Sequence, residues 1–164
     1  MVAKKKGPRH ILWAPWRMEY IKRPRESGCF LCNSLRSRAD RANGVVLRGR
    51  TCAVVLNRYP YTGGHLMVAP LRHVAALDGL TKPELNEMIR LMMRSLGLLR
   101  KALHPHGFNV GLNIGEAAGA GLKDHVHLHI VPRWNGDTNF MPVLGKTQVT
   151  PVSLGSLWDL LRGK

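Results

Sequence analysis

The run His125-Val126-His127-Leu128-His129-Ile130-Val131-Pro132 has a histidine at every second position and apolar residues between them. Side chains on a β-strand alternate between two faces, so this spacing predicts a strand whose three imidazoles share one face. Val126, Leu128 and Ile130 then share the other face, which we expect to pack into a hydrophobic core. The chain is therefore constrained to form a sheet with a core on one side and titratable rings on the other.

The histidine row has three interpretations. Imidazole titrates near neutral pH, attacks phosphorus and leaves again, which suits a two-step transfer through a phosphoramidate. In that case His127, which has a histidine on each flank, is the predicted nucleophile. The row could instead chelate a transition metal, with one open position for zinc hydrolysis, or be structural. The glycine-rich stretch 115–121 favours phosphate chemistry, because its backbone N–H groups can approach an anion.

Other segments predict the elements around this strand. Strand-like runs lie at 45–47, 52–56, 65–69 and 108–114, a loop is expected over 22–43, and a short helix near 153–162. The clearest helix is 81–104, because Thr81 and Glu84 fit a capping box. It has an apolar stripe at steps of three and four, made of Leu85, Met88, Ile89, Met92, Leu96, Leu99 and Leu103. Short strands around one long helix predict an α+β fold with an antiparallel sheet.

Charge and length restrict the possible partners and locations. The net charge is +15, of which residues 1–50 contribute +10, so a polyanionic small molecule or a nucleic acid fits. We expect 1–10 to be a disordered basic tail and 11–164 to be a single domain. No apolar stretch is long enough for a membrane span. Three cysteines and the lack of a signal sequence predict a cytoplasmic protein.

The sequence resembles the histidine triad (HIT) superfamily, whose signature His-φ-His-φ-His-φ-φ, with φ apolar, is matched by residues 125–131. Residues 56–74 resemble the first half-site of that superfamily, and 108–134 resemble the second. With 136–140 and the aromatic arm 13–21, the chain is similar to bacterial diadenosine tetraphosphate hydrolases and phosphorylases. The resemblance implies a five-stranded antiparallel sheet, one long helix, a short C-terminal helix, and a homodimer with a continuous ten-stranded sheet.

The resemblance also implies roles for four histidines. His127 would take up the nucleotidyl group. His129 would hydrogen-bond the phosphate or bridging oxygen and assist the leaving group. His125 would support the strand, and His65 would orient His127 through its ring or its carbonyl.

Substrate contacts are carried over in the same way. Asn57 matches a ribose-binding asparagine, and Asn113 lies where an amide contacts ribose or phosphate. Gly119, Ala120 and Gly121 match the phosphate-facing loop. That loop usually carries a Gln, Ser or Thr, which is absent here, so backbone amides would do more of the binding.

A second group of residues indicates a metal site. Cys29-x-x-Cys32 could bind zinc. The resemblance implies that His73 and His125 complete a four-ligand structural site. The alternative is a reduced cysteine pair that binds no metal.

The leading functional hypothesis is an enzyme that cleaves dinucleoside polyphosphates through a nucleotidyl-histidine intermediate. Water as second acceptor gives a hydrolase, and inorganic phosphate gives a phosphorylase. A third triad histidine slightly favours water, although the resemblance also reaches phosphorylases. Two alternatives are a nucleoside phosphoramidate hydrolase and a nucleotide- or RNA-binding module with incidental catalysis, which the basic N-terminal part motivates.

Overall fold

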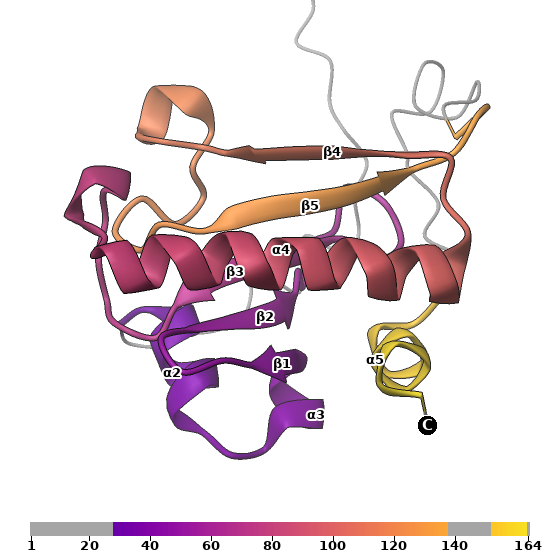
Figure 1. Ribbon diagram of the computed structural model, residues 1–164, viewed down its shortest axis with the longest axis horizontal. Helices are drawn as coiled ribbons and strands as arrows, with labels where there is room; N and C mark the ends of the chain where they lie inside the picture. The colour runs from indigo at the N-terminus through magenta and orange to yellow at the C-terminus, as the bar shows by residue number, and fades with distance from the viewer. Residues whose placement is uncertain (1–27, 138–151, 164) are drawn as a thin grey trace, which may run out of the picture.

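Five antiparallel strands form one sheet in the computed structural model, which describes residues 28–137 and 152–163 (Figure 1). Their spatial order is β1-β2-β3-β5-β4. The strands are β1 Val45–Arg48, β2 Cys52–Leu56, β3 Leu66–Pro70, β4 Gly107–Leu112 and β5 Leu128–Arg133. The predicted α+β class with a five-stranded antiparallel sheet is confirmed. The predicted tail 1–10 and the arm 13–21 lie outside the described residues, and the single domain over 11–164 stays a prediction.

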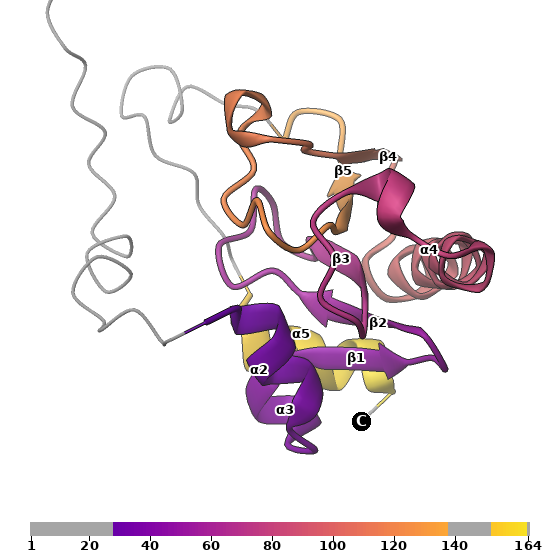
Figure 2. The same cartoon turned by 90° about the vertical axis from the view of Figure 1, so that its left-hand side faces the viewer.

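Helices flank both faces of the sheet. They are α2 Phe30–Arg36, α3 Asp40–Asn43, α4 Lys82–Leu103 and α5 Leu154–Arg162, with single 3-10 turns η1 Leu77–Gly79 and η2 Glu116–Ala118. The long α4 and the short C-terminal α5 confirm the two predicted helices. Figure 2 shows α4 on one side of the sheet and α2 on the other. Within the described ranges, no helix has the length and apolar character that a membrane crossing requires.

The helix α4 begins as its sequence predicts. The side chain of Thr81 accepts from the N–H of Glu84, and the Glu84 carboxylate accepts from the N–H of Thr81. The buried face differs from the predicted stripe, because Leu91 is buried whereas Ile89 is 52% exposed. The buried face of α4 also includes Glu84 and Glu87. Their carboxylates accept hydrogen bonds from outside the helix, Glu84 from Arg72 and Glu87 from the N–H of Cys52.

The loop predicted over 22–43 is wrong at Phe30–Arg36, which forms α2, and at Asp40–Asn43, which forms the short α3. The sulfur of Cys29 accepts from the N–H of Cys32 and caps the first turn. Leu31 and Leu35, one turn apart, are buried beneath the sheet. A cysteine is an uncommon N-cap. The sequence therefore lacks the usual signal for the start of a helix, and the charged residues around it are typical of a loop.

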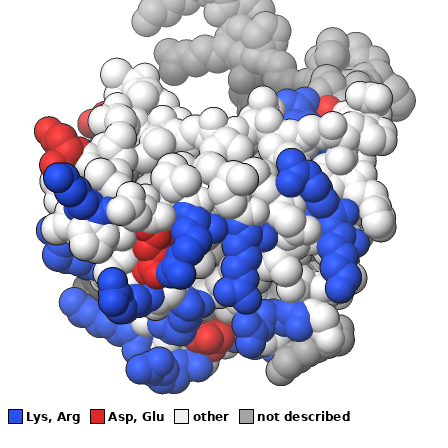
Figure 3. Space-filling view, viewed as in Figure 1, with Lys and Arg blue, Asp and Glu red and all other residues white. Residues whose placement is uncertain are grey.

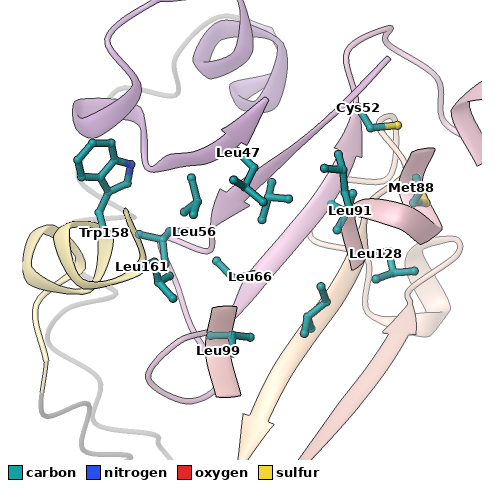
Figure 4. Packing of buried hydrophobic residues seen from close by; sticks show 14 of the residues in the cluster. Leu47, Cys52, Leu56, Leu66, Met88, Leu91, Leu99, Leu128, Trp158 and Leu161 are labelled. Carbon is teal, nitrogen blue, oxygen red and sulfur yellow. The ribbon is translucent and has the colours of Figure 1, made fainter. Parts of the chain in front are cut away.

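Two apolar clusters fix the position of the sheet. The larger lies between the sheet, α4 and α5 and includes Leu66, Leu99, Leu128 and Trp158 (Figure 4). The smaller lies under α2 and reaches Val45 on β1, Val55 on β2 and Met67 on β3. On the α2 face, the small cluster includes no residue of β4 or β5. That end of the sheet is where the histidines lie.

Candidate active site

The triad segment divides as its alternation predicts. Val126, Leu128 and Ile130 belong to the core cluster beside α4. The side chains of His127 and His129 lie together on the other face, with ring centroids 4.8 Å apart. All three triad rings are buried, with exposed fractions of 0%, 7% and 9% for His125, His127 and His129. The regular strand begins only at Leu128, so the first three predicted strand residues form an extended lead-in to β5.

The tautomer of His127 follows from one hydrogen bond. Its Nδ1 lies 2.8 Å from the carbonyl oxygen of His125. A carbonyl oxygen only accepts, so Nδ1 carries the proton and Nε2 of the neutral ring carries the lone pair. The free lone pair is what a nucleophilic imidazole needs. The structure therefore presents His127 in the form that attacks through Nε2.

A second chain of hydrogen bonds fixes the protons on His65 and His129. The N–H of Tyr61 donates to Nδ1 of His65 at 3.1 Å, and the Asn57 amide lies 3.3 Å from the same nitrogen. His65 therefore carries its proton on Nε2, which donates to Nδ1 of His129 at 2.9 Å. His129 in turn carries its proton on Nε2. The lone pair assigned to His127 and the N–H assigned to His129 thus belong to two rings whose centroids are 4.8 Å apart.

The ring of His65 contacts His129 rather than His127. Its carbonyl accepts from the N–H of Asn57, 2.9 Å away. The orientation of His127 by His65 through ring or carbonyl stays a prediction, and the contact that the structure gives the His65 ring is with His129.

Burial keeps these rings neutral. Desolvation, followed by the charges of the neighbouring His129 and His127, lowers the pKa of His65 to about 3. Desolvation, followed by the charge of His127, lowers the pKa of His129 to about 4. Near pH 7 both rings are uncharged, so each has one N–H and one lone pair, as the hydrogen-bond chain requires.

An open groove of about 440 Å³ lies beside His129. Gly111 is opposite His129 and Asn109 is opposite Val131 in the β4–β5 register, so these residues share the face of the triad rings. A Cβ built on Gly111 would meet no atom within 4 Å. The groove is lined by Tyr61, Thr62, Asn109, Val110, Gly111, Leu112, Asn113, His129, Val131, Arg133 and Asp137. There is therefore open space next to the reactive rings for a nucleoside-sized ligand.

The structure places the predicted substrate contacts unevenly. Asn113 lines the groove, whereas Asn57 lies behind the rings, where its Oδ1 accepts from the N–H of Tyr59 at 2.8 Å. Gly119 and Ala120 use their N–H groups within the loop, on the carbonyls of Glu116 and Gly115. No residue of the stretch 119–121 lines the groove. Phosphate binding by these three amides stays a prediction.

Sequence reasoning missed part of the groove wall. Asn109 and Gly111 stand at alternate positions before Asn113, which is the same period of two as in the triad. This alternation of polar and small residues was the sequence signal that could have identified them as part of the groove wall. The ion pair between Arg133 and Asp137, on the groove wall, gave none, because it depends on how the chain turns after β5.

The four predicted metal ligands come together at the other end of the triad segment. One ligand atom from each of Cys29, Cys32, His73 and His125 lies within 4.8 Å of the other three. Nδ1 of His125 is 3.3 Å from the sulfur of Cys29 and 3.5 Å from that of Cys32, and Nδ1 of His73 is 3.3 Å from Cys32. The structure thus brings together residues from three separate parts of the chain.

This donor set fits zinc. Tetrahedral zinc with bonds of about 2.0–2.3 Å separates its sulfur and nitrogen ligands by about 3.3–3.8 Å, which these contacts match. Nε2 of His125 lies 2.9 Å from the carbonyl oxygen of Pro70 and must donate to it. The lone pair of His125 therefore faces the sulfurs, and the Pro70 carbonyl acts as the outer partner that metal-binding histidines usually have.

Comparisons with known proteins agree with this geometry. Residues 39–136 match the model of the HIT domain family. A Mycobacterium tuberculosis protein named AP-4-A phosphorylase is 40% identical over 158 residues, 92% of this chain and 81% of its own length. A Schizosaccharomyces pombe protein named bis(5'-nucleosyl)-tetraphosphatase (asymmetrical) is 32% identical over 57% of this chain and 50% of its own. The crystal structure of a Zn-bound histidine triad family protein from Mycobacterium smegmatis has a TM-score of 0.67 at 26% identity, covering 83% of this chain and 91% of the other.

Proposed function

Because the chain belongs to the HIT domain family, we propose that it is a nucleotide enzyme that transfers a nucleotidyl group from a dinucleoside polyphosphate, of which diadenosine tetraphosphate is the model substrate. The observation that carries the proposal is the contact of two rings, 4.8 Å apart between their centroids: His127, with a lone pair on Nε2, and His129, which has an N–H on Nε2 and lines the groove. We further propose inorganic phosphate as the second acceptor. The 40% identity to a named phosphorylase supports this choice over water.

The first step forms a covalent intermediate. The lone pair of Nε2 on His127 attacks the α-phosphorus, and the electrons of the broken P–O bond leave with the remaining nucleoside polyphosphate. His127 keeps its Nδ1 proton, so the nucleotidyl-imidazole gains a positive charge that the carbonyl of His125 stabilises. The N–H of His129 donates a hydrogen bond to the departing oxygen. Because that oxygen belongs to a phosphate anion, no full proton transfer is required.

The second step releases His127. A phosphate dianion attacks the same phosphorus, and the P–N electrons return to Nε2. From diadenosine tetraphosphate the two products are ATP and ADP. Water would instead give ATP and AMP, but it must lose a proton, and the lone pair of His129 is already occupied by the N–H of His65. Phosphate needs no such base, which also supports phosphorolysis.

Product analysis tests the proposal. The purified chain is incubated with diadenosine tetraphosphate, with and without inorganic phosphate, and the nucleotides are separated. We expect ATP and ADP, with ADP formed only when phosphate is present. AMP in both incubations would make the enzyme a hydrolase, and cleavage of a nucleoside phosphoramidate alone would favour that alternative.

The cluster of Cys29, Cys32, His73 and His125 would hold the zinc ion. All four protein ligands are present, so no position remains open for a substrate and the metal is structural. Burial is the main cause that raises the pKa of the Cys32 thiol, and the contact with Cys29 raises it further. Zinc binding would therefore displace protons from the thiols.

We propose a homodimer formed through β4. Among the described strands, β4 is at the end of the sheet, with β5 as its neighbour, and Val110 and Ile114 are 42% and 56% exposed. An uncovered strand edge with apolar side chains favours pairing with a second copy. We expect light scattering to give twice the 18.3 kDa chain mass, and Val110→Asp to give the monomer. The control Ile89→Asp, at a residue 52% exposed on α4, should stay dimeric; a monomeric wild type would contradict the proposal.

Nucleic acid is the second candidate partner. The outer face of α4 carries Lys82, Arg90, Arg94, Arg100 and Lys101, while Glu84 and Glu87 are buried. Figure 3 shows Lys and Arg spread over this face with few acidic residues. The helix α4 covers the face of the sheet that is opposite His129. A polyanion bound to α4 would therefore leave the groove accessible. If the product analysis shows no turnover, RNA binding that weakens steeply with salt would favour the binding module.

A further inference from the structure

One residue, His125, takes part in both the metal cluster and the candidate active site. Its ring nitrogen Nδ1 faces the sulfurs of Cys29 and Cys32, at 3.3 and 3.5 Å. Its carbonyl oxygen accepts the Nδ1 proton of His127 at 2.8 Å. The metal ligand and the group that sets the tautomer of the nucleophile are thus parts of the same residue.

The segment that carries His125 is held in the core by Val126 but lies outside the sheet ladder. The pairing of β5 with β3 and β4 begins at Leu128, so residues 125–127 precede the sheet ladder. Two further bonds hold this segment: the N–H of Val126 donates to the carbonyl of Val74 at 2.7 Å, and the ring of His125 donates to the carbonyl of Pro70. Pro70 and Val74 flank the ligand His73, so both bonds end on the loop that a bound metal would fix.

We propose that metal occupancy of this cluster controls the aim and tautomer of His127 through the carbonyl of His125. This proposal rests on the nucleophilic role proposed for His127. With the metal bound, the loop 70–74, α2 and the lead-in to β5 are held together and the carbonyl stays in place. Without it, His125 loses a ligand bond, its carbonyl shifts, and His127 can place its proton on Nε2, where it blocks the attacking lone pair. His125 is therefore a positioning residue for the nucleophile.

The test compares two cysteine variants of the full chain. Cys32→Ser removes a ligand that contacts both His73 and His125, whereas Cys52→Ser changes the other described free cysteine, which is buried in the core away from the cluster. Metal content is measured by mass spectrometry, the tautomer of His127 by nitrogen NMR of the imidazole rings, and turnover by product analysis. We expect Cys32→Ser to lose zinc, lose the Nδ1–H form of His127 and fall about 10–100-fold in kcat with little change in KM. Cys52→Ser should keep its zinc and the Nδ1–H form.

A reversible experiment covers the case in which Cys32→Ser does not fold. Zinc is removed from the wild-type chain with a chelator and then added back, while the His127 signal and kcat are followed. Loss and recovery of both support the proposal. A folded metal-free protein that keeps the Nδ1–H form and full kcat overturns it. The NMR reading needs no substrate, so a metal-dependent tautomer without any turnover would leave the coupling intact and refute only the proposed function.

Discussion

His127→Ala is expected to reduce nucleotide turnover by about 10⁴-fold or more while the protein stays folded. The substitution removes the Nε2 lone pair of the ring that lies next to His129, a residue of the groove wall, so no nucleotidyl-histidine forms. The fold survives because Leu128 and Ile130 still anchor the strand in the core, and one lost hydrogen bond to His125 costs about 1 kcal/mol. The measurements are kcat and the mass of the covalent intermediate, which wild type should accumulate during turnover and the variant should lack.

The matched control is His106→Ala. His106 is exposed, and its Nδ1 accepts from the N–H of Asn135 outside the described groove. This variant should turn over substrate at the wild-type rate. Turnover retained by folded His127→Ala would assign the attack to another group.

Glu87→Ala is expected to lower the free energy of unfolding by about 3–5 kcal/mol. The Glu87 carboxylate is buried and accepts from the N–H of Cys52 at 2.9 Å and from the hydroxyl of Thr51 at 2.8 Å. It also accepts from the N–H of Thr51 and from Arg90. Alanine leaves these donors at the β1–β2 turn without their acceptor, and the turn loses its tie to α4.

Denaturant unfolding measures this loss. The matched control is Glu116→Ala, since that carboxylate is 88% exposed and pairs only loosely with Lys123 at 4.0 Å. Its effect should stay within about 0.5 kcal/mol. A loss below about 1 kcal/mol for Glu87→Ala would mean that the turn finds other acceptors.

The contribution of Glu87 should also depend on pH. Burial raises the pKa of this carboxyl, but the hydrogen bonds from Thr51 and its neighbours outweigh burial and lower the pKa to about 2, from an ordinary 4.5. A folded-state pKa below the unfolded value stabilises the fold above the unfolded pKa. The stabilisation is then lost as pH falls from 4.5 toward 2. The stability difference between wild type and Glu87→Ala should shrink over the same range.

Residue spacing within one strand or one helical turn was enough to predict the faces of the triad segment and the start of α4. The alternation at 125–131 gave the separation of Val126, Leu128 and Ile130 from the imidazoles. Thr81 and Glu84 gave the start of α4, because both halves of a capping box are within one helical turn. The metal ligands were a different case. The Cys-x-x-Cys spacing of Cys29 and Cys32 indicated a metal site by itself. Only the family resemblance added His73 and His125 as further ligands.

Interactions between distant residues account for what the sequence did not predict. The burial of Glu87 depends on Thr51, which is 36 positions away. The contact of His65 with His129 spans 64 positions. The side chains of the groove wall are set by the pairing of β4 with β5. None of these partners is marked by spacing along the chain.

The bond from the N–H of Tyr61 to His65 has a consequence for how such sites diversify. The proton order of the whole imidazole chain begins at a main-chain group, which every amino acid except proline supplies. Residue 61, which lines the groove, can therefore be exchanged for any residue except proline while the order of the protons stays the same. Substrate preference and reaction chemistry can then change independently at one position.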